Sequence, residues 1–133
     1  MLLKSLIIKH EGLRLKPYRC SAGKLTIGVG RNLEDTGITR EEAEILLNGD
    51  LARSSHDAMA IFPQFFTYSN NRQNAIIDML FNLGKSRFFK FRKMIKAIKN
   101  NDWQEAAIQA ADSKWYRQVG VRAVEDIKLL KEG

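Results

Sequence analysis

Three residues near the N-terminus have side chains that could do chemistry together: Glu11, Cys20 and Thr26. A carboxyl group can give a proton to a leaving group, and a thiol can act as a weak base or a nucleophile. Taken singly, each has an ordinary explanation, because Glu11 could be a surface residue, Cys20 a small core residue and Thr26 a typical strand residue. The joint pattern, E-x8-C-x5-T followed by IGVG, favours a shared site.

Glu11 falls at the carbonyl end of a predicted helix. Apolar residues at positions 2, 3, 6, 7 and 8 predict a helix from Leu2 to His10 with one buried face, and Gly12 is its expected C-terminal cap. The negative end of the helix dipole, together with partial burial, disfavours the ionised form of a carboxyl group there. A carboxyl that keeps its proton near neutral pH is suited to general acid catalysis.

The thiol of Cys20 needs help to ionise. The ordinary pKa of a cysteine is about 8.5, so Cys20 is mostly neutral at about pH 7. Lys16, Arg19 and Lys24 are the basic residues near it that could lower this pKa. As a neutral thiol, Cys20 is a weaker base than an Asp carboxylate would be.

The elements that must position these residues can be read from the rest of the chain. Glycines and the alternating LTIGVG between Gly12 and Leu33 predict a hairpin or a three-stranded meander. Helical patterns follow, and several begin at a capping residue. The expected helices are Arg40 to about Met59 after Thr39 and Glu42, a core helix after Ser69 or Asn70 that stops at Gly84, a basic helix through 88–99, one opened by Asp102 and Glu105 through 103–111, and Val119 to Lys131.

These elements predict a single α+β domain over residues 1–133. A small N-terminal β lobe, at about 12–35, is expected beside a larger helical lobe formed by 1–11 and 39–133, which includes an interlobe helix, with a cleft between the lobes. The length of 133 residues is ordinary for one domain.

Composition narrows the classes of partner. The chain carries 22 Lys and Arg against 15 Asp and Glu, a net charge of +7, which favours a polyanion such as nucleic acid, anionic lipid or a cell-wall polymer, or is only a solvated basic surface. The sequence contains neither a helix-turn-helix pattern nor an RNP-type aromatic motif, so no nucleic acid partner is expected. The basic segment FFKFRKMIKAIK could contact phosphate or a membrane, although its apolar positions fit a core face equally well.

Other features bear on cofactors and location. Cys20 is the only cysteine, which excludes an internal disulfide and a Cys-rich metal site, and no cofactor or metal is expected. The apolar run at the N-terminus is too short for a signal peptide or a membrane span.

The motif around the three residues resembles the bacteriophage lysozymes of the T-even type, glycoside hydrolase family 24. HEGLRLKPYRC and TIGVG carry the resemblance, and TREEAEILLNGD, DMLFNLG and DWQEAAIQAADSKWY extend it over nearly the whole chain. The resemblance implies a lysozyme-like fold, with Glu11 as the general acid and with Cys20 and Thr26 positioning or activating the attacking water. Cys20 then occupies the place of an Asp.

The same resemblance suggests residues beyond this triad. It implies that Phe81, Asn82 and Gln109 line a sugar-binding cleft, although Phe81 could instead seal the core and the two amides could face solvent. It also implies a structural ion pair between Arg31 and Asp50. The connection from Arg31 to Thr39 is shorter than in the T-even type, which removes part of one cleft wall.

The implied function is that of an endolysin that hydrolyses the β-1,4 bond between N-acetylmuramic acid and N-acetylglucosamine in peptidoglycan and so lyses the host cell. The alternatives are a lytic transglycosylase, which leaves anhydro-sugar ends, and an inactive basic module that only binds the cell wall. A monomer is expected from base rates alone, and the missing signal predicts a protein of the host cytoplasm without stable membrane insertion. The resemblance implies release to the periplasm and cell wall through membrane lesions made by a holin.

Overall fold

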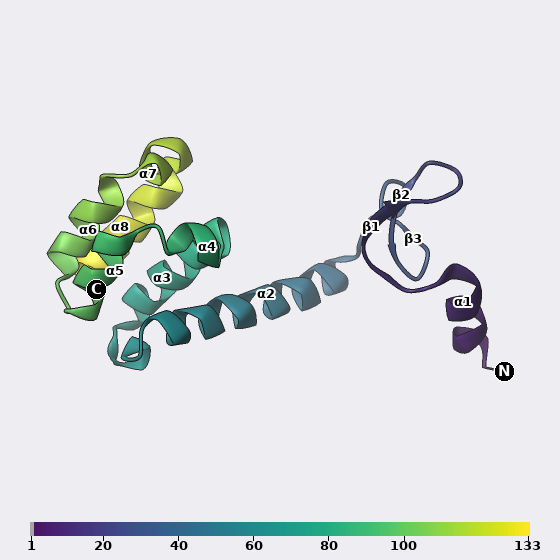
Figure 1. Cartoon of the computed structure of the whole chain (residues 1–133), viewed down its shortest axis with the longest axis horizontal. Coiled ribbons are helices and arrows are strands. Elements are labelled where there is room, and N and C mark those ends of the chain that lie inside the picture. Colours follow the sequence, from purple (N-terminus) through teal and green to yellow (C-terminus); the bar gives the residue numbers. More distant parts are fainter. Residues whose placement is uncertain (1) are drawn as a thin grey trace. The chain divides into compact units, whose positions relative to one another are not determined.

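The structure is a computed structural model that describes residues 2–133. The chain divides into two compact units, one ending at Leu46 and the other running from Leu47 to Gly133 (Figure 1). The first unit contains a small three-stranded sheet, and the second is built from helices.

The first unit begins with helix α1, Leu3–Glu11, close to the predicted bounds. It ends at Gly12, whose φ of 77° favours glycine and whose N–H donates to the Ile8 carbonyl, as expected of a C-terminal cap. The predicted buried face is wrong, because Leu3 is 71% exposed and Ile7 is 44% exposed. The physical reason is that the described part of this unit buries no apolar side chain, so it has no core for α1 to pack against.

The predicted meander is confirmed. Strands β1, β2 and β3 form one antiparallel sheet in that order, and their bounds are Arg14–Arg19, Leu25–Gly28 and Arg31–Asn32. The β1–β2 register is irregular between Arg14 and Tyr18, after which Tyr18 pairs with Thr26 and Arg19 with Leu25. The sheet therefore sets Thr26 on its central strand.

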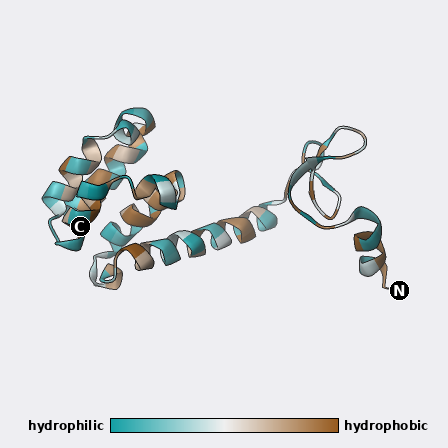
Figure 2. Cartoon of the chain, viewed as in Figure 1, coloured by the Kyte–Doolittle hydropathy of each residue, from teal (hydrophilic) through white to brown (hydrophobic). Residues whose placement is uncertain are grey.

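Helix α2, Arg40–Ile61, starts with the predicted capping box. The N–H of Thr39 donates to Glu42 Oε1 at 2.9 Å, and the N–H of Glu42 donates to Thr39 Oγ1 at 3.1 Å. The helix is longer than predicted by two residues and buries Ala58 and Ile61 in its last turns. Its earlier turns carry exposed apolar residues among polar ones (Figure 2).

The ion pair predicted between Arg31 and Asp50 is wrong. Arg31 instead makes a two-pronged pair with Glu42, with both N···O distances at 2.9 Å, and Asp50 pairs with Arg53 one turn along α2. The capping box explains the difference, because it brings Glu42 to the start of α2, where Arg31 reaches it.

The second unit contains a 3-10 turn and six helices after α2. Their bounds are η1 Phe65–Thr67, α3 Asn70–Leu83, α4 Lys85–Phe88, α5 Arg92–Lys99, α6 Trp103–Ala111, α7 Lys114–Val119 and α8 Val121–Glu132. The predicted caps are confirmed for α3, where Ser69 accepts from the Arg72 N–H, and for α6, where Asp102 accepts from the Glu105 N–H.

Two helical predictions for this unit need correction. The basic helix through 88–99 is broken into α4 and α5, because the chain turns at 89–91 so that the rings of Phe88 and Phe91 lie 6.4 Å apart and Phe91 packs on Trp115. Helix α7 was not predicted, and the last helix starts after Gly120, whose φ of 71° separates it from α7.

The hydrophobic core lies in the second unit, where α5 and α8 pack with α6, and α3 packs with α8. Phe62 is fully buried and contacts Tyr68 and Phe88 edge to face. Between residues 2 and 133, no helix is both long enough and apolar enough to cross a membrane.

A charged cluster joins α3 to α8. Arg122 donates two hydrogen bonds of 2.8 Å to the carboxylate of Asp78. Asp126 lies beside them and is 4% exposed, and its Oδ2 lacks a hydrogen-bond partner among the described residues. Burial, reinforced by Asp78, raises the pKa of Asp126 to about 8.

Candidate active site

Glu11 ends α1, and its carboxylate lies against the turn between β2 and β3. A Cβ atom added to Gly30 would stand 2.8 Å from Glu11 Oε2, so only a glycine leaves room for this carboxylate. The φ of 70° at Gly30 also favours glycine. Glu11 is exposed, so the partial burial that the sequence suggested is absent.

Cys20 opens the tight turn that connects β1 to β2. Its N–H donates to the Lys24 carbonyl at 2.9 Å, and its own carbonyl accepts from the Gly23 N–H at 2.8 Å. Gly23 has a φ of 78°, which the turn requires and other residues rarely adopt. The thiol is partly exposed and so can react.

The turn also changes the acidity of Cys20. Hydrogen bonding with the backbone of Lys24 and then of Ala22 lowers the pKa of the thiol, and the Thr26 side chain contributes in the same direction. The sequence named Lys16, Arg19 and Lys24 as residues whose charges could lower this pKa, but backbone hydrogen bonds are the main cause of the lowering.

Thr26 is the one buried residue between positions 2 and 46, at 3% exposure. Its hydroxyl donates to the Lys24 carbonyl at 2.8 Å, the same oxygen that accepts from the Cys20 N–H. Cys20 and Thr26 are therefore tied to one carbonyl, Cys20 through its backbone N–H and Thr26 through its side chain. The structure brings these two predicted residues together.

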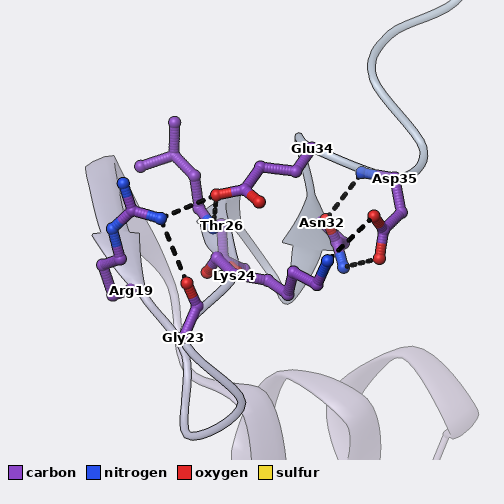
Figure 3. A network of polar contacts seen from close by, with 8 residues as sticks. Arg19, Gly23, Lys24, Thr26, Asn32, Glu34 and Asp35 are labelled. Carbon is purple, nitrogen blue, oxygen red and sulfur yellow. Dashed lines mark hydrogen bonds and ion pairs between the residues drawn. The ribbon is translucent and has the colours of Figure 1, made fainter.

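A polar network surrounds this turn (Figure 3). Arg19 bridges the Gly23 carbonyl and the Glu34 carboxylate, while Lys24 and Asn32 both contact Asp35. Sequence analysis missed Glu34 and Asp35. The signal that could have found them is the pair of acidic residues that follows the basic residues Arg19 and Lys24 of the glycine-containing turn, although the sequence does not show which charges meet.

Two of the three predicted sugar-binding residues share a pocket in the second unit. Asn82 and Gln109 both line a hollow of about 710 Å³, and Phe81 is not among its lining residues. Phe81 is 40% exposed, so it does not seal the core either. Asn82 Oδ1 accepts from the Trp115 indole N–H at 2.9 Å, which leaves its amide N–H groups free to donate to a ligand.

Gln109 is anchored within its own helix. Its amide donates to Glu105 at 2.7 Å, which holds the side chain in place at the pocket.

The lining of this pocket is strongly basic. The lining contains a single carboxylate, Asp112, against five cations: Arg87, Lys90, Arg92, Lys93 and Lys114. Such a pocket suits a sugar polymer that carries anionic groups.

The model of the phage lysozyme family matches residues 8–129. The chain belongs to the phage lysozyme family. The three-stranded antiparallel sheet followed by a mostly helical remainder is the lysozyme-like α+β arrangement that the sequence predicted.

Individual relatives agree with this membership. "Probable T4-type lysozyme 2" of Dictyostelium discoideum is 26% identical, and the match covers 98% of this chain and 94% of that protein. "Endolysin" of Acyrthosiphon pisum secondary endosymbiont phage 1 is 34% identical over 83% of this chain and 74% of its own length. "Pre-baseplate central spike protein Gp5" of Enterobacteria phage T4 is 31% identical over 92% of this chain, which spans only 26% of that longer protein.

Proposed function

We propose that this phage lysozyme family member is a glycosidase that hydrolyses the β-1,4 bond between N-acetylmuramic acid and N-acetylglucosamine in peptidoglycan. The observation that carries the proposal is the turn at Cys20, where the Cys20 N–H and the Thr26 hydroxyl both bond the Lys24 carbonyl and the partly exposed thiol has a lowered pKa. Glu11 lies against Gly30, in the turn that follows the strand of Thr26. A partly exposed thiol with a lowered pKa, in a turn that also holds a buried hydroxyl, is more typical of a functional site than of a purely structural turn.

In the proposed mechanism, Glu11 gives its proton to the glycosidic oxygen as the bond breaks. Cys20 and Thr26 hold the water that attacks the anomeric carbon. The lowered pKa of Cys20 makes the thiolate more available, so it can take the proton of this water more readily than an ordinary cysteine. Cys20 thereby serves where many glycosidases use a second carboxylate.

The second unit would supply substrate binding. Asn82 and Gln109 are placed to hydrogen-bond a glycan, and the cations of their pocket suit the anionic character of the cell wall. We further propose the biological role of an endolysin that works as a monomer and reaches the wall through membrane lesions made by a separate protein.

The test combines one substitution with product analysis. Glu11→Gln should lower the rate of wall cleavage by about a thousandfold or more, because it removes the proton donor while keeping the size of the side chain. Mass spectrometry of the digest should show reducing ends from the unsubstituted enzyme. Full activity of Glu11→Gln would refute the assignment, and anhydro-sugar ends would identify a transglycosylase.

Cys20 is tested in the same assay. Cys20→Asp should largely preserve activity because a carboxylate can activate water in this position, whereas Cys20→Ser should lose most of it. A fully active Cys20→Ser variant would show that the thiol only packs against its neighbours.

A further inference from the structure

Glu34 accepts hydrogen bonds from two sides of the turn that carries Cys20. One carboxylate oxygen, Oε1, receives the Arg19 guanidinium at 2.7 Å and the Leu25 backbone N–H at 2.9 Å. Arg19 is the last residue of β1 and Leu25 the first of β2. Glu34 therefore hydrogen-bonds to both strands at the ends that the turn connects (Figure 3).

Arg19 also hydrogen-bonds to the backbone of the turn itself. The same Nη1 that binds Glu34 also donates to the Gly23 carbonyl at 3.1 Å. Gly23 in turn donates its N–H to the Cys20 carbonyl at 2.8 Å. A continuous chain of hydrogen bonds therefore runs from Glu34 through Arg19 to the backbone of Cys20.

We propose that Glu34 and Arg19 form a clasp that sets the conformation of the Cys20–Lys24 turn and thereby holds the Cys20 thiol in its working position beside Thr26. Both are positioning residues, since they act on the thiol only through the turn. The inference rests on the proposed function for its catalytic meaning, while the clasp itself is a property of the turn.

The exposure of the clasp indicates that positioning is its main effect. The side chains of Arg19 and Glu34 are 65% and 37% exposed, and ion pairs of that kind add little to the stability of a fold. The turn, however, supplies the backbone groups at Lys24 and Ala22 that lower the pKa of Cys20. Loosening the turn removes those groups from the sulfur and makes the thiol less acidic.

A purely electrostatic effect of the two charges on the pKa of Cys20 would have the opposite direction for Glu34→Ala. Removing the negative charge of Glu34 stabilises a nearby thiolate through space, whereas removing the positive charge of Arg19 destabilises it. Loss of positioning makes the thiol less acidic in both cases. The direction of the change in Glu34→Ala therefore separates the two explanations.

The experiment measures the rate at which iodoacetamide alkylates Cys20 as a function of pH, using the full chain and mass spectrometry. Cys20 is the only cysteine, so the signal has a single source. We expect Glu34→Ala and Arg19→Ala each to raise the apparent pKa of alkylation and to slow the reaction at neutral pH by about threefold to tenfold. Melting temperatures of the variants show whether the fold is kept.

Asp35→Ala is the matched control. Asp35 is the next residue and also carries a negative charge, but it binds the side chains of Lys24 and Asn32 and makes no hydrogen bond to the backbone of residues 20–23 among the described contacts. We expect its alkylation profile to match that of the unsubstituted chain. Faster alkylation of Glu34→Ala, or an equal loss in Asp35→Ala, would overturn the clasp.

Wall cleavage provides a second readout that links the clasp to function. If Cys20 is the group that activates water, Glu34→Ala should lower kcat severalfold with KM unchanged, because the substrate contacts remain. A raised KM with kcat unchanged would overturn the positioning role. Alkylation does not require glycan cleavage, so failure of the clasp can be told apart from failure of the proposed function.

Discussion

The two compact units of this chain are stabilised by different means. From Leu47 onward, helices enclose a core of fully buried apolar residues such as Phe62 and Ile76. Between residues 2 and 46, Thr26 is the one buried side chain, and hydrogen bonds and ion pairs hold the sheet and its turns. The candidate catalytic residues therefore lie where polar contacts decide the geometry, while the second unit is held by an apolar core.

The largest effect that tests this contrast is the loss of a core ring. Phe62→Ala should lower the free energy of unfolding by about 3–5 kcal/mol, because it leaves a cavity beside Tyr68 and Phe88. Phe66→Ala is the control, since Phe66 is 74% exposed and should cost less than about 0.5 kcal/mol. Urea unfolding measures both, and similar losses would show that the second unit does not depend on its core as described.

In the first unit, a single substitution to alanine at Gly30 should affect activity more than stability. Gly30→Ala places a methyl group where Glu11 Oε2 now lies, so the carboxylate must move, and a shift of about 1 Å can cost roughly 100-fold in rate.

Gly28→Ala is the control for Gly30→Ala. Both glycines have a φ of 70°, but a Cβ atom at Gly28 would meet nothing within 4 Å. The two variants should therefore share the backbone strain and differ in wall cleavage. Equal activities would show that the position of Glu11 over Gly30 is unimportant.

A smaller effect should appear when pH changes the charge of Asp126, the buried member of the charged cluster in the second unit. The folded-state pKa of Asp126 is about 8, above its ordinary value of 3.8, so the folded state keeps a proton that the unfolded state releases. Stability should therefore fall as pH rises from about 4 to about 8. Asp126→Asn stays neutral and should be more stable than the unsubstituted chain by about 1–3 kcal/mol at alkaline pH.

The measurement for Asp126→Asn is urea unfolding at about pH 5 and about pH 9. The gain in stability of Asp126→Asn should be smaller at the acidic pH, where Asp126 of the folded chain is still protonated and Arg122 remains paired with Asp78. A gain that does not change with pH would contradict the protonated state of Asp126.

The smallest expected effect concerns the ion pair at the start of α2. The Arg31 guanidinium, with the Thr39 N–H, lowers the pKa of Glu42 to about 2. The contribution of ionised Glu42 to the stability of the fold is therefore present above the ordinary pKa of 4.5 and is lost as pH falls towards 2. Glu42→Gln should cause only a small loss of stability near neutral pH, since both partners are more than a third exposed and solvent screens the pair.

Glu41→Gln is the control for Glu42→Gln, because Glu41 lies in the same first turn of α2 and is exposed. Thermal unfolding should show a loss for Glu42→Gln that shrinks in acid and little change for Glu41→Gln. An equal loss of stability in both variants would show that the effect comes from the helix dipole and that the pair with Arg31 adds nothing.

Local patterns predicted much of the fold because their causes are local. The capping box at Thr39, the N-cap at Asp102 and the glycine ends at Gly12 and Gly84 depend on residues within one turn, so the sequence is enough to place them. The break between α4 and α5 was missed because it depends on how Phe91 packs against Trp115, which is distant in the sequence.

The sequence by itself determined the spacing of Glu11, Cys20 and Thr26, the three-stranded sheet before the helices, and the family. Only the tertiary structure decided the partners: Arg31 with Glu42, Arg122 with Asp78, and Glu34 with the turn of Cys20. The physical reason is that spacing along the chain fixes backbone hydrogen bonds within an element. A charged side chain, in contrast, pairs with whichever opposite charge the folded backbone brings within reach.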